Sequence, residues 1–371
     1  MATRISPLFD SLLAEKGSDL HLSAGYPPMG RIRGKLTPLR EAPLTESEVE
    51  TMLLEIVTPE QKLQITEELD LNFAYTYGSK GRFRANYFYK TTGLAAVFRF
   101  IPPKVQSLQE LGMPEVVRRL VERRGGLVLV AGPAGSGRST TLAAMLHHLN
   151  QVRHVNLLTI EEPVEFVHEP ASAQVTHREI GPHAPSFAAA LHSAAREDVN
   201  AVLASELSTP EAMRLALQLA SSGVLVLATV YAQGAQAALE HILHAFPAEE
   251  QAQIRGLLGD SLAGVLSQQL LRTPNGKARV LALEVLLGGG AVAAMIRQGQ
   301  MSQLAGMMQA GQAQGMQTLD QHLERLLAAG TVSAEDALEV ALEREAFART
   351  VKRLQPGFEL PEDLKGITIS G

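Results

Sequence analysis

The strongest signal of architecture in this chain is Gly132-Pro133-Ala134-Gly135-Ser136-Gly137-Arg138-Ser139-Thr140. It directly follows the apolar run Leu127–Ala131 and directly precedes the helical pattern Thr140–Leu149. A strand, a glycine loop and a helix in this order turn backbone N–H groups and a helix N-terminus toward phosphate oxygens. The spacing G-x-x-x-x-G, a basic residue and Ser therefore predicts a Walker A phosphate loop rather than a bare glycine turn.

The sequence around this loop has the pattern of an α/β sheet. Short apolar runs at Leu127–Ala131, Asn156–Ile160, Ala201–Ala204 and Val224–Thr229 are separated by helical patterns. Continuous apolar runs of this length are typical of parallel strands that are buried on both faces. We therefore expect a central, mostly parallel sheet covered by helices.

The rest of the chain divides by pattern into segments of a different character. Before residue 100, alternating and aromatic strand patterns follow a short amphipathic helix over residues 5–16, which predicts a small α+β domain. From Ala291 the pattern is helical, and the proline- and glycine-containing tail has little periodicity, so we expect poor order there. The expected boundaries are 1–100 for the first domain, 101–113 for a linker, 114–290 for the phosphate-loop domain, 291–353 for helices and 354–371 for the tail.

Composition excludes several classes of protein. The 371 residues carry a formal charge of -6 and no Cys, so we expect no disulfides, no thiolate chemistry and no general affinity for nucleic acid. The N-terminus lacks the pattern of a signal peptide, and the apolar stretch Val280–Ile296 is interrupted by Glu284 and by glycines. We expect no transmembrane helix and an intracellular protein.

One residue of the loop departs from its motif. Arg138 stands where a Walker A loop has Lys, and a planar guanidinium does not replace a compact ammonium between the β- and γ-phosphates. Backbone donors and Ser139, which is placed to ligate magnesium, favour phosphate binding all the same. Loss of one preorganised donor costs about 3 kcal/mol of transition-state stabilisation, so we expect hydrolysis to be weakened more than binding.

Six ordered motifs resemble one family, the type IV pilus retraction motors of the PilT and PilU type, within the bacterial type II/IV secretion ATPase superfamily. The resemblance covers about residues 5 to 350. It rests on the phosphate loop together with Gly17-Ser-Asp-Leu-His-Leu-Ser-Ala-Gly25, Gly81-Arg-Phe-Arg84, Thr159-Ile-Glu-Glu-Pro-Val-Glu165, Phe246-Pro-Ala-Glu-Glu250 and Gly315-Met-Gln-Thr-Leu-Asp320. The segment Leu266–Lys277 and the extra C-terminal tail favour the PilU branch.

The resemblance implies two catalytic carboxylates. Glu165 matches the general base of the family's acidic box, and Glu206, after the apolar run Ala201–Ala204, matches the Walker B carboxylate that holds magnesium together with Ser139. The alternative for Glu165 and its neighbours Glu161 and Glu162 is a group of solvated surface glutamates.

The resemblance also implies a nucleotide-binding set that spans both domains. Arg82, Arg84 and Arg99 match family positions near the nucleotide, where arginines neutralise γ-phosphate charge. A salt-bridged strand surface is the alternative for these three, and Arg196 is a weaker candidate. The full set is Gly132, Pro133, Ala134, Gly135, Ser136, Gly137, Arg138, Ser139, Thr140, Arg82, Arg84 and Arg99.

Several positions depart from the family pattern. Ser205 replaces a Gly, while Ser208 and Thr209 replace the Arg-Asp that follows the Walker B Glu. Val224 and Tyr231 stand where the family places histidines. Together with Arg138, these substitutions change positions that the family uses for catalysis. The glycines and Ser139, which are expected to bind nucleotide, are kept.

By resemblance, the fold is an N-terminal PAS-like α+β domain, a RecA-like P-loop domain and a C-terminal helical region. The implied protein binds ATP and Mg²⁺, assembles as a homo-hexamer or in a mixed ring with a paralogous pilus ATPase, and acts on the inner-membrane platform protein of the pilus machine. It is cytoplasmic and peripheral at the inner membrane, and it supports pilus retraction and twitching motility.

Two alternatives remain open. The first is a non-hydrolysing accessory subunit that supports an intact paralogous motor, and its motivation is the set of substituted positions. The second is a DNA- or RNA-dependent P-loop motor, which the formal charge of -6 disfavours.

Overall fold

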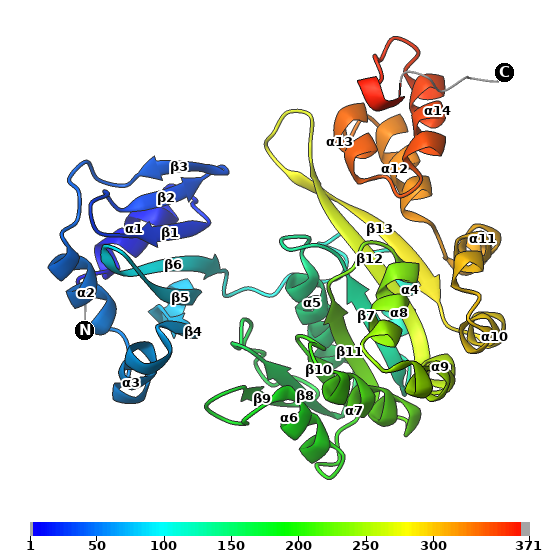
Figure 1. Cartoon of the computed structure of the whole chain (residues 1–371), viewed down its shortest axis with the longest axis horizontal. Coiled ribbons are helices and arrows are strands. Elements are labelled where there is room, and N and C mark those ends of the chain that lie inside the picture. Colours follow the sequence, from blue (N-terminus) through cyan, green and yellow to red (C-terminus); the bar gives the residue numbers. More distant parts are fainter. Residues whose placement is uncertain (1–2, 365–371) are drawn as a thin grey trace. The chain divides into compact units, whose positions relative to one another are not determined.

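The computed structural model describes residues 3–364 and separates the chain into two compact units (Figure 1). Unit 1 consists of the residues up to Lys104 together with the short segment Glu162–Val167. Unit 2 is the remainder of the described chain. The acidic segment predicted to carry a catalytic base therefore groups with the N-terminal unit, although it follows a strand of unit 2 in sequence.

The described part of unit 1 is built on a six-stranded antiparallel sheet with the order β3-β2-β1-β6-β5-β4. Its core is aromatic: the rings of Phe9 and Phe83 stack with centroids 4.0 Å apart, and Tyr87 is fully buried beside them. The strands are β1 Asp19–Leu22, β2 Met29–Ile32, β3 Lys35–Pro38, β4 Asp70–Thr76, β5 Arg82–Lys90 and β6 Gly93–Ile101.

Helices cover this sheet and begin at clear sequence signals. Thr45 and Thr58 each form a capping box with the Glu or Gln three residues later, which satisfies backbone N–H groups of the first turn. The helices are α1 Ser6–Ala14, α2 Glu46–Leu54 and α3 Pro59–Glu68, with a 3-10 turn η1 at Gly78–Lys80. The predicted first helix and the small α+β unit are confirmed.

The described part of unit 2 contains a seven-stranded sheet with the order β13-β12-β7-β11-β10-β8-β9. Only the β12–β13 pair is antiparallel, so the expectation of a mostly parallel sheet is confirmed. The strands are β7 Gly126–Ala131, β8 Asn156–Glu161, β9 Gln174–Glu179, β10 Ala201–Ala204, β11 Leu225–Val230, β12 Leu262–Arg272 and β13 Arg279–Leu287.

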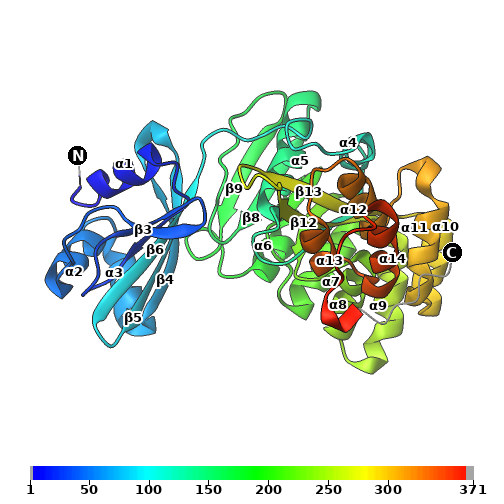
Figure 2. The ribbon, with the colours of Figure 1, turned by 90° about the horizontal axis from the view of Figure 1, so that it is seen from above.

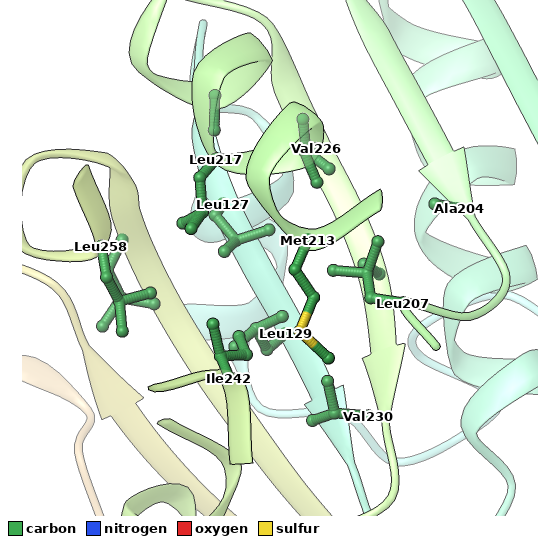
Figure 3. Close-up of a cluster of buried hydrophobic side chains, with 14 of the residues drawn as sticks. Leu127, Leu129, Ala204, Leu207, Met213, Leu217, Val226, Val230, Ile242 and Leu258 are labelled. Carbon is green, nitrogen blue, oxygen red and sulfur yellow. The ribbon is translucent and has the colours of Figure 1, made fainter. Parts of the chain in front are cut away.

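Helices pack on both faces of this sheet (Figure 2). Leu127 and Leu129 of β7 belong to a core with the helices of one face, including Met213 and Ile242 (Figure 3). The alternate residues of β7 belong to a second core with α4 and α5, because successive side chains of a strand point to opposite faces. The helices are α4 Glu115–Val121, α5 Arg138–Val152, α6 Phe187–Ala194, α7 Pro210–Ser221, α8 Ala235–His244 and α9 Ala248–Ser261.

The chain from residue 290 onward is helical, as the sequence pattern predicts. The elements are α10 Gly290–Gln298, η2 Met301–Gln303, α11 Leu304–Ala310, η3 Gln312–Gln314, α12 Leu319–Ala328, α13 Ala334–Val340, α14 Arg344–Leu354 and η4 Glu362–Leu364. Helices α12, α13 and α14 form a cluster with the outer ends of β12 and β13. Within residues 3–364, no helix combines the length and apolar character needed to cross a membrane.

The expectation of poor order over 354–371 stays a prediction, although the described part of this tail contacts the C-terminal helices. Its described part packs onto the α12–α14 cluster, where Leu360 and Leu364 are buried. Burial of these two apolar side chains favours the packed position of the segment. Residues 365–371 lie outside the described residues.

Candidate functional site

The carboxyl ends of three parallel strands bring the predicted motifs to one edge of the unit 2 sheet. Ala131 of β7 pairs in register with Val230 of β11, and Ala228 of β11 pairs with Ala204 of β10. The phosphate loop after β7, Tyr231 after β11 and Glu206 after β10 therefore leave the sheet at the same edge. In open α/β sheets, ligands bind at this carboxyl edge.

Two glycines of the phosphate loop occupy positions that disfavour any residue with a Cβ atom. At Gly132, a Cβ would collide with Ser136 Oγ and with the carbonyl oxygen of Gln268, so no larger residue fits. Gly137 has a φ of 92°, in the left-handed region, and precedes the first turn of α5. The loop thus turns sharply from β7 into the N-terminus of α5.

The residues of this loop fit a phosphate group. The first N–H groups of helix α5 have no intrahelical partner, as in any α-helix, and no side chain of the described residues caps them. They face the loop, where an anion can accept from them. The hydroxyl of Ser136 is buried and has no hydrogen-bond partner among the described residues. Ser139 is exposed in the first turn of α5, where a hydroxyl can ligate magnesium.

Arg138 is buried within the loop, with 9% of its surface exposed. Its Nη1 donates to the carbonyl oxygen of Gly132 at 2.7 Å and to that of Val230 at 3.0 Å. The ring of Tyr231 covers the guanidinium, with 3.6 Å between Cζ and the ring centroid. The residue that replaces the Walker A Lys is therefore held by two strand ends and an aromatic ring.

Gln268, which sequence reasoning missed, supports the loop from β12. Its Nε2 donates to the carbonyl oxygen of Ser136 at 2.7 Å, and its Oε1 accepts from the Thr141 hydroxyl at 3.0 Å. The adjacent Ser267 accepts from the N–H of Gly234, in the loop that carries Tyr231. The available signal was the run of polar residues inside an otherwise apolar strand.

Glu206 lies at the expected strand edge, after β10. The β10 end is tied to β11, because the Thr229 hydroxyl donates to the carbonyl oxygen of Ser205. Among the described residues, no group of three or more His, Asp or Glu side chains is arranged to hold a metal ion. Magnesium at a nucleotide site takes most of its ligands from water and phosphate oxygens. The role of Ser139 and Glu206 as its protein ligands stays a prediction.

The predicted base Glu165 and the predicted arginines of β5 and β6 lie in unit 1. Arg84 of β5 donates to Glu165 at 3.2 Å, so the structure joins two residues that the sequence assigned separately. Arg99, which pairs with Arg84 across β5 and β6, is bonded to Asp19 at 3.0 Å. These ion pairs are what a salt-bridged strand surface predicts, and the nucleotide role of Arg84 and Arg99 stays a prediction.

Two further arginines complete the predicted set. Arg82 is on the same face of β5 as Arg84, and its Nε is buried without a hydrogen-bond partner among the described residues. Arg196 is exposed just after α6 in unit 2. Their roles also stay predictions.

Comparison with known proteins identifies the relatives of this chain. The profile of the type II/IV secretion system protein family matches residues 5–353. The chain is 42% identical over 330 residues to the type IV pilus retraction ATPase PilT of Pseudomonas aeruginosa, a match that covers 89% of this chain and 96% of that protein. The type IV pilus ATPase PilU of the same organism is 36% identical over 328 residues, covering 88% of this chain and 86% of that protein.

A solved structure supports the same relationship. The crystal structure of the pilus retraction motor PilT with bound ADP superposes with a TM-score of 0.85 at 33% identity, over 94% of this chain and 100% of that one. The expected preference for the PilU branch receives no support from overall identity, which is higher with PilT. The chain belongs to the type II/IV secretion system protein family, as one of its type IV pilus ATPases of the PilT/PilU type.

Proposed function

We propose that this chain is an ATP-binding motor subunit of a type IV pilus machine that supports pilus retraction and twitching motility. The observation that carries the proposal is the phosphate loop, where, among the described residues, the buried Ser136 hydroxyl has no hydrogen-bond partner and the start of α5 has no side-chain cap. Glu206 at the same sheet edge supplies a carboxylate for magnesium. The ADP bound to the related PilT motor supports the choice of an adenine nucleotide.

The assembly that we propose follows the family. Subunits form a hexameric ring, either of this chain alone or mixed with a paralogous pilus ATPase. The ring acts on the platform protein of the pilus machine at the cytoplasmic side of the inner membrane, and ATP turnover drives rotation of the two units. Glu165 serves as the general base, while Arg82, Arg84 and Arg99 respond to the γ-phosphate.

A second function is favoured by one specific observation. The guanidinium of Arg138 is bonded to the carbonyl oxygens of Gly132 and Val230. A cation whose N–H groups donate to backbone carbonyl oxygens stabilises the negative charge of the transition state less than a Walker A Lys does. The second candidate is therefore a non-hydrolysing accessory subunit that binds nucleotide and supports an intact paralogous motor.

Single-turnover hydrolysis distinguishes the two candidates. Purified protein in excess over labelled ATP is mixed with magnesium, and Glu165→Gln and Glu206→Gln serve as controls for a contaminating ATPase. Turnover in the parent that disappears in both variants supports a motor in its own right. Equal turnover in all three proteins assigns the activity to a contaminant.

Nucleotide binding without turnover supports the accessory candidate. In that case we expect that Arg138→Lys alone does not restore hydrolysis, because the other substituted positions remain. Brisk hydrolysis by that single variant would contradict the accessory function. Absence of both binding and turnover would contradict both candidates.

A further inference from the structure

Tyr231 has an environment that a simple surface residue lacks. It directly follows β11, and 53% of its surface is exposed. The inner face of its ring lies on the Arg138 guanidinium, with Cζ 3.6 Å from the centroid. The ring therefore covers a buried cation on one side and faces outward on the other.

The bonds of Arg138 explain why the stacked position is stable. Nη1 carries two hydrogens, and both are donated, one to Gly132 O and one to Val230 O. These bonds lie in the plane of the guanidinium, so the flat face remains free to stack on the ring. A Lys ammonium has three N–H donors but no flat face, so it would contact the ring as a compact charge and not by stacking.

The loop that carries Tyr231 is itself fixed at its far end. The N–H of Gly234 donates to Ser267 Oγ at 2.9 Å, and the N–H of Ala235 donates to the buried carboxyl group of Glu284. The backbone is therefore held on both sides of the ring, by β11 before it and by these bonds after it. A fixed ring gives Arg138 a fixed position.

We propose that Tyr231 is a positioning residue that keeps Arg138 bonded to the two strand-end carbonyls, so that the site distinguishes poorly between nucleoside di- and triphosphates. This inference rests on the proposed nucleotide binding. A Walker A cation normally bonds the β- and γ-phosphates, which gives a triphosphate an advantage. Here Arg138 must give up the stack and its carbonyl bonds to follow the γ-phosphate, and the advantage is cancelled.

The experiment compares the affinities for ADP and for the β,γ-methylene analogue of ATP, both with magnesium, in the full chain. The measured quantity is the ratio of the two dissociation constants. The variants are Tyr231→Ala, Tyr231→Phe and Arg138→Ala, together with the double variant. Because the Tyr231 side chain is half exposed, its removal leaves the hydrophobic cores intact.

We expect the parent to bind both nucleotides within about threefold of each other. Tyr231→Ala removes the stack that helps to hold the guanidinium, and the ratio moves by about tenfold toward the triphosphate, the size of a partly desolvated cation–π contact. Tyr231→Phe keeps the stack and behaves as the parent. In the Arg138→Ala background, Tyr231→Ala leaves the ratio unchanged.

Two results would overturn the inference while the proposed function stands. One is an equal change of both affinities in Tyr231→Ala, which would indicate a general structural role. The other is a change of the ratio in the Arg138→Ala background, which would mean that Tyr231 does not act through the arginine. Failure of the parent to bind either nucleotide would instead contradict the proposed function, and the inference with it.

Discussion

At the scale of single residues, Gln268 holds the phosphate loop and the start of α5 through two hydrogen bonds. Its amide satisfies the Ser136 carbonyl and the Thr141 hydroxyl, both in a buried environment. We expect Gln268→Met to lower the free energy of unfolding by about 1–3 kcal/mol, because two buried polar groups lose their partner. Urea denaturation measures this, and nucleotide affinity is expected to fall in the same variant.

The neighbouring Gln269 provides the matched control. It is also buried, but it points to the opposite face of β12, and its side chain makes no hydrogen bond among the described residues. We expect Gln269→Met to change stability and nucleotide affinity much less. Equal losses in the two variants would contradict the specific role of Gln268.

The limits of sequence reasoning are visible in the same residues. The phosphate loop could be predicted because its glycines, its strand and its helix are contiguous in sequence. The partners of Arg138 could not, because Val230 and Tyr231 lie more than ninety residues away and meet the loop only through the β7–β11 register. The Arg84–Glu165 ion pair was hidden for the same reason.

At the scale of elements, three histidines connect α5 with the segments around β9. The His168 and His177 rings stack with centroids 5.8 Å apart, and His147 is 6.3 Å from His168. Burial, followed by the charges of His177 and His147, lowers the pKa of His168 to about 4 from an ordinary 6.5. The folded protein therefore holds this imidazole neutral.

The sign of the pH effect follows from this lowered pKa. The stability that His168 contributes is present above pH 6.5 and is lost as the pH falls toward 4, because the unfolded chain takes up the proton first. Between pH 7 and pH 4 the free energy of unfolding falls, and we expect His168→Gln to make this fall smaller by about 3 kcal/mol. Urea denaturation across this range checks it, and an acid-induced loss of the same size in parent and variant would contradict the lowered pKa.

Glu284 of β13 links two helices through one buried carboxyl group. It accepts from the N–H of Ala235, at the start of α8, and from the N–H of Leu319 at 3.2 Å, at the start of α12. Burial raises the pKa of Glu284 above its ordinary value, and these two hydrogen bonds partly oppose the rise. The carboxyl group joins the phosphate-loop edge to the C-terminal helices.

We expect Glu284→Gln to destabilise the protein by about 1–3 kcal/mol, because an amide offers one acceptor oxygen to two N–H donors. A raised pKa means that the stability contributed by the parent residue is present below the ordinary glutamate pKa and is lost as the pH rises through the raised one. The difference in the free energy of unfolding between parent and variant should therefore become smaller as the pH rises. Denaturation curves from pH 5 to pH 8 test this, and a constant difference would contradict the raised pKa.

Helices and strands were predicted correctly where a single hydrophobic pattern dominates the sequence. The strands β7, β8, β10 and β11 were predicted from continuous apolar runs, and α1 from its apolar face. The hairpin of β12 and β13 was missed because polar Ser267 and Gln268 interrupt the first strand and the glycines after the second suggest a turn. The packing of the tail was missed because it depends on isolated leucines that meet a surface formed by distant helices.

At the scale of the whole molecule, the core of unit 1 comes from one continuous part of the chain. All residues of its hydrophobic cluster lie between Ile5 and Phe100, and the segment Glu162–Val167 contributes none to it. We therefore expect a fragment of residues 1–104 to fold alone and to unfold cooperatively in urea, as followed by circular dichroism. A fragment that lacks stable structure would mean that the unit depends on the rest of the chain.

The shared bond of α8 and α12 to Glu284 has a mechanical consequence. Helix α8 begins four residues after Tyr231, so the loop that carries Tyr231 and the first helix of the α12–α14 cluster are bonded to the same side chain. Glu284 is therefore a shared anchor of the two helices. A continuous hydrogen-bonded connection runs through this carboxyl group from the C-terminal helices to the sheet edge that carries the phosphate loop.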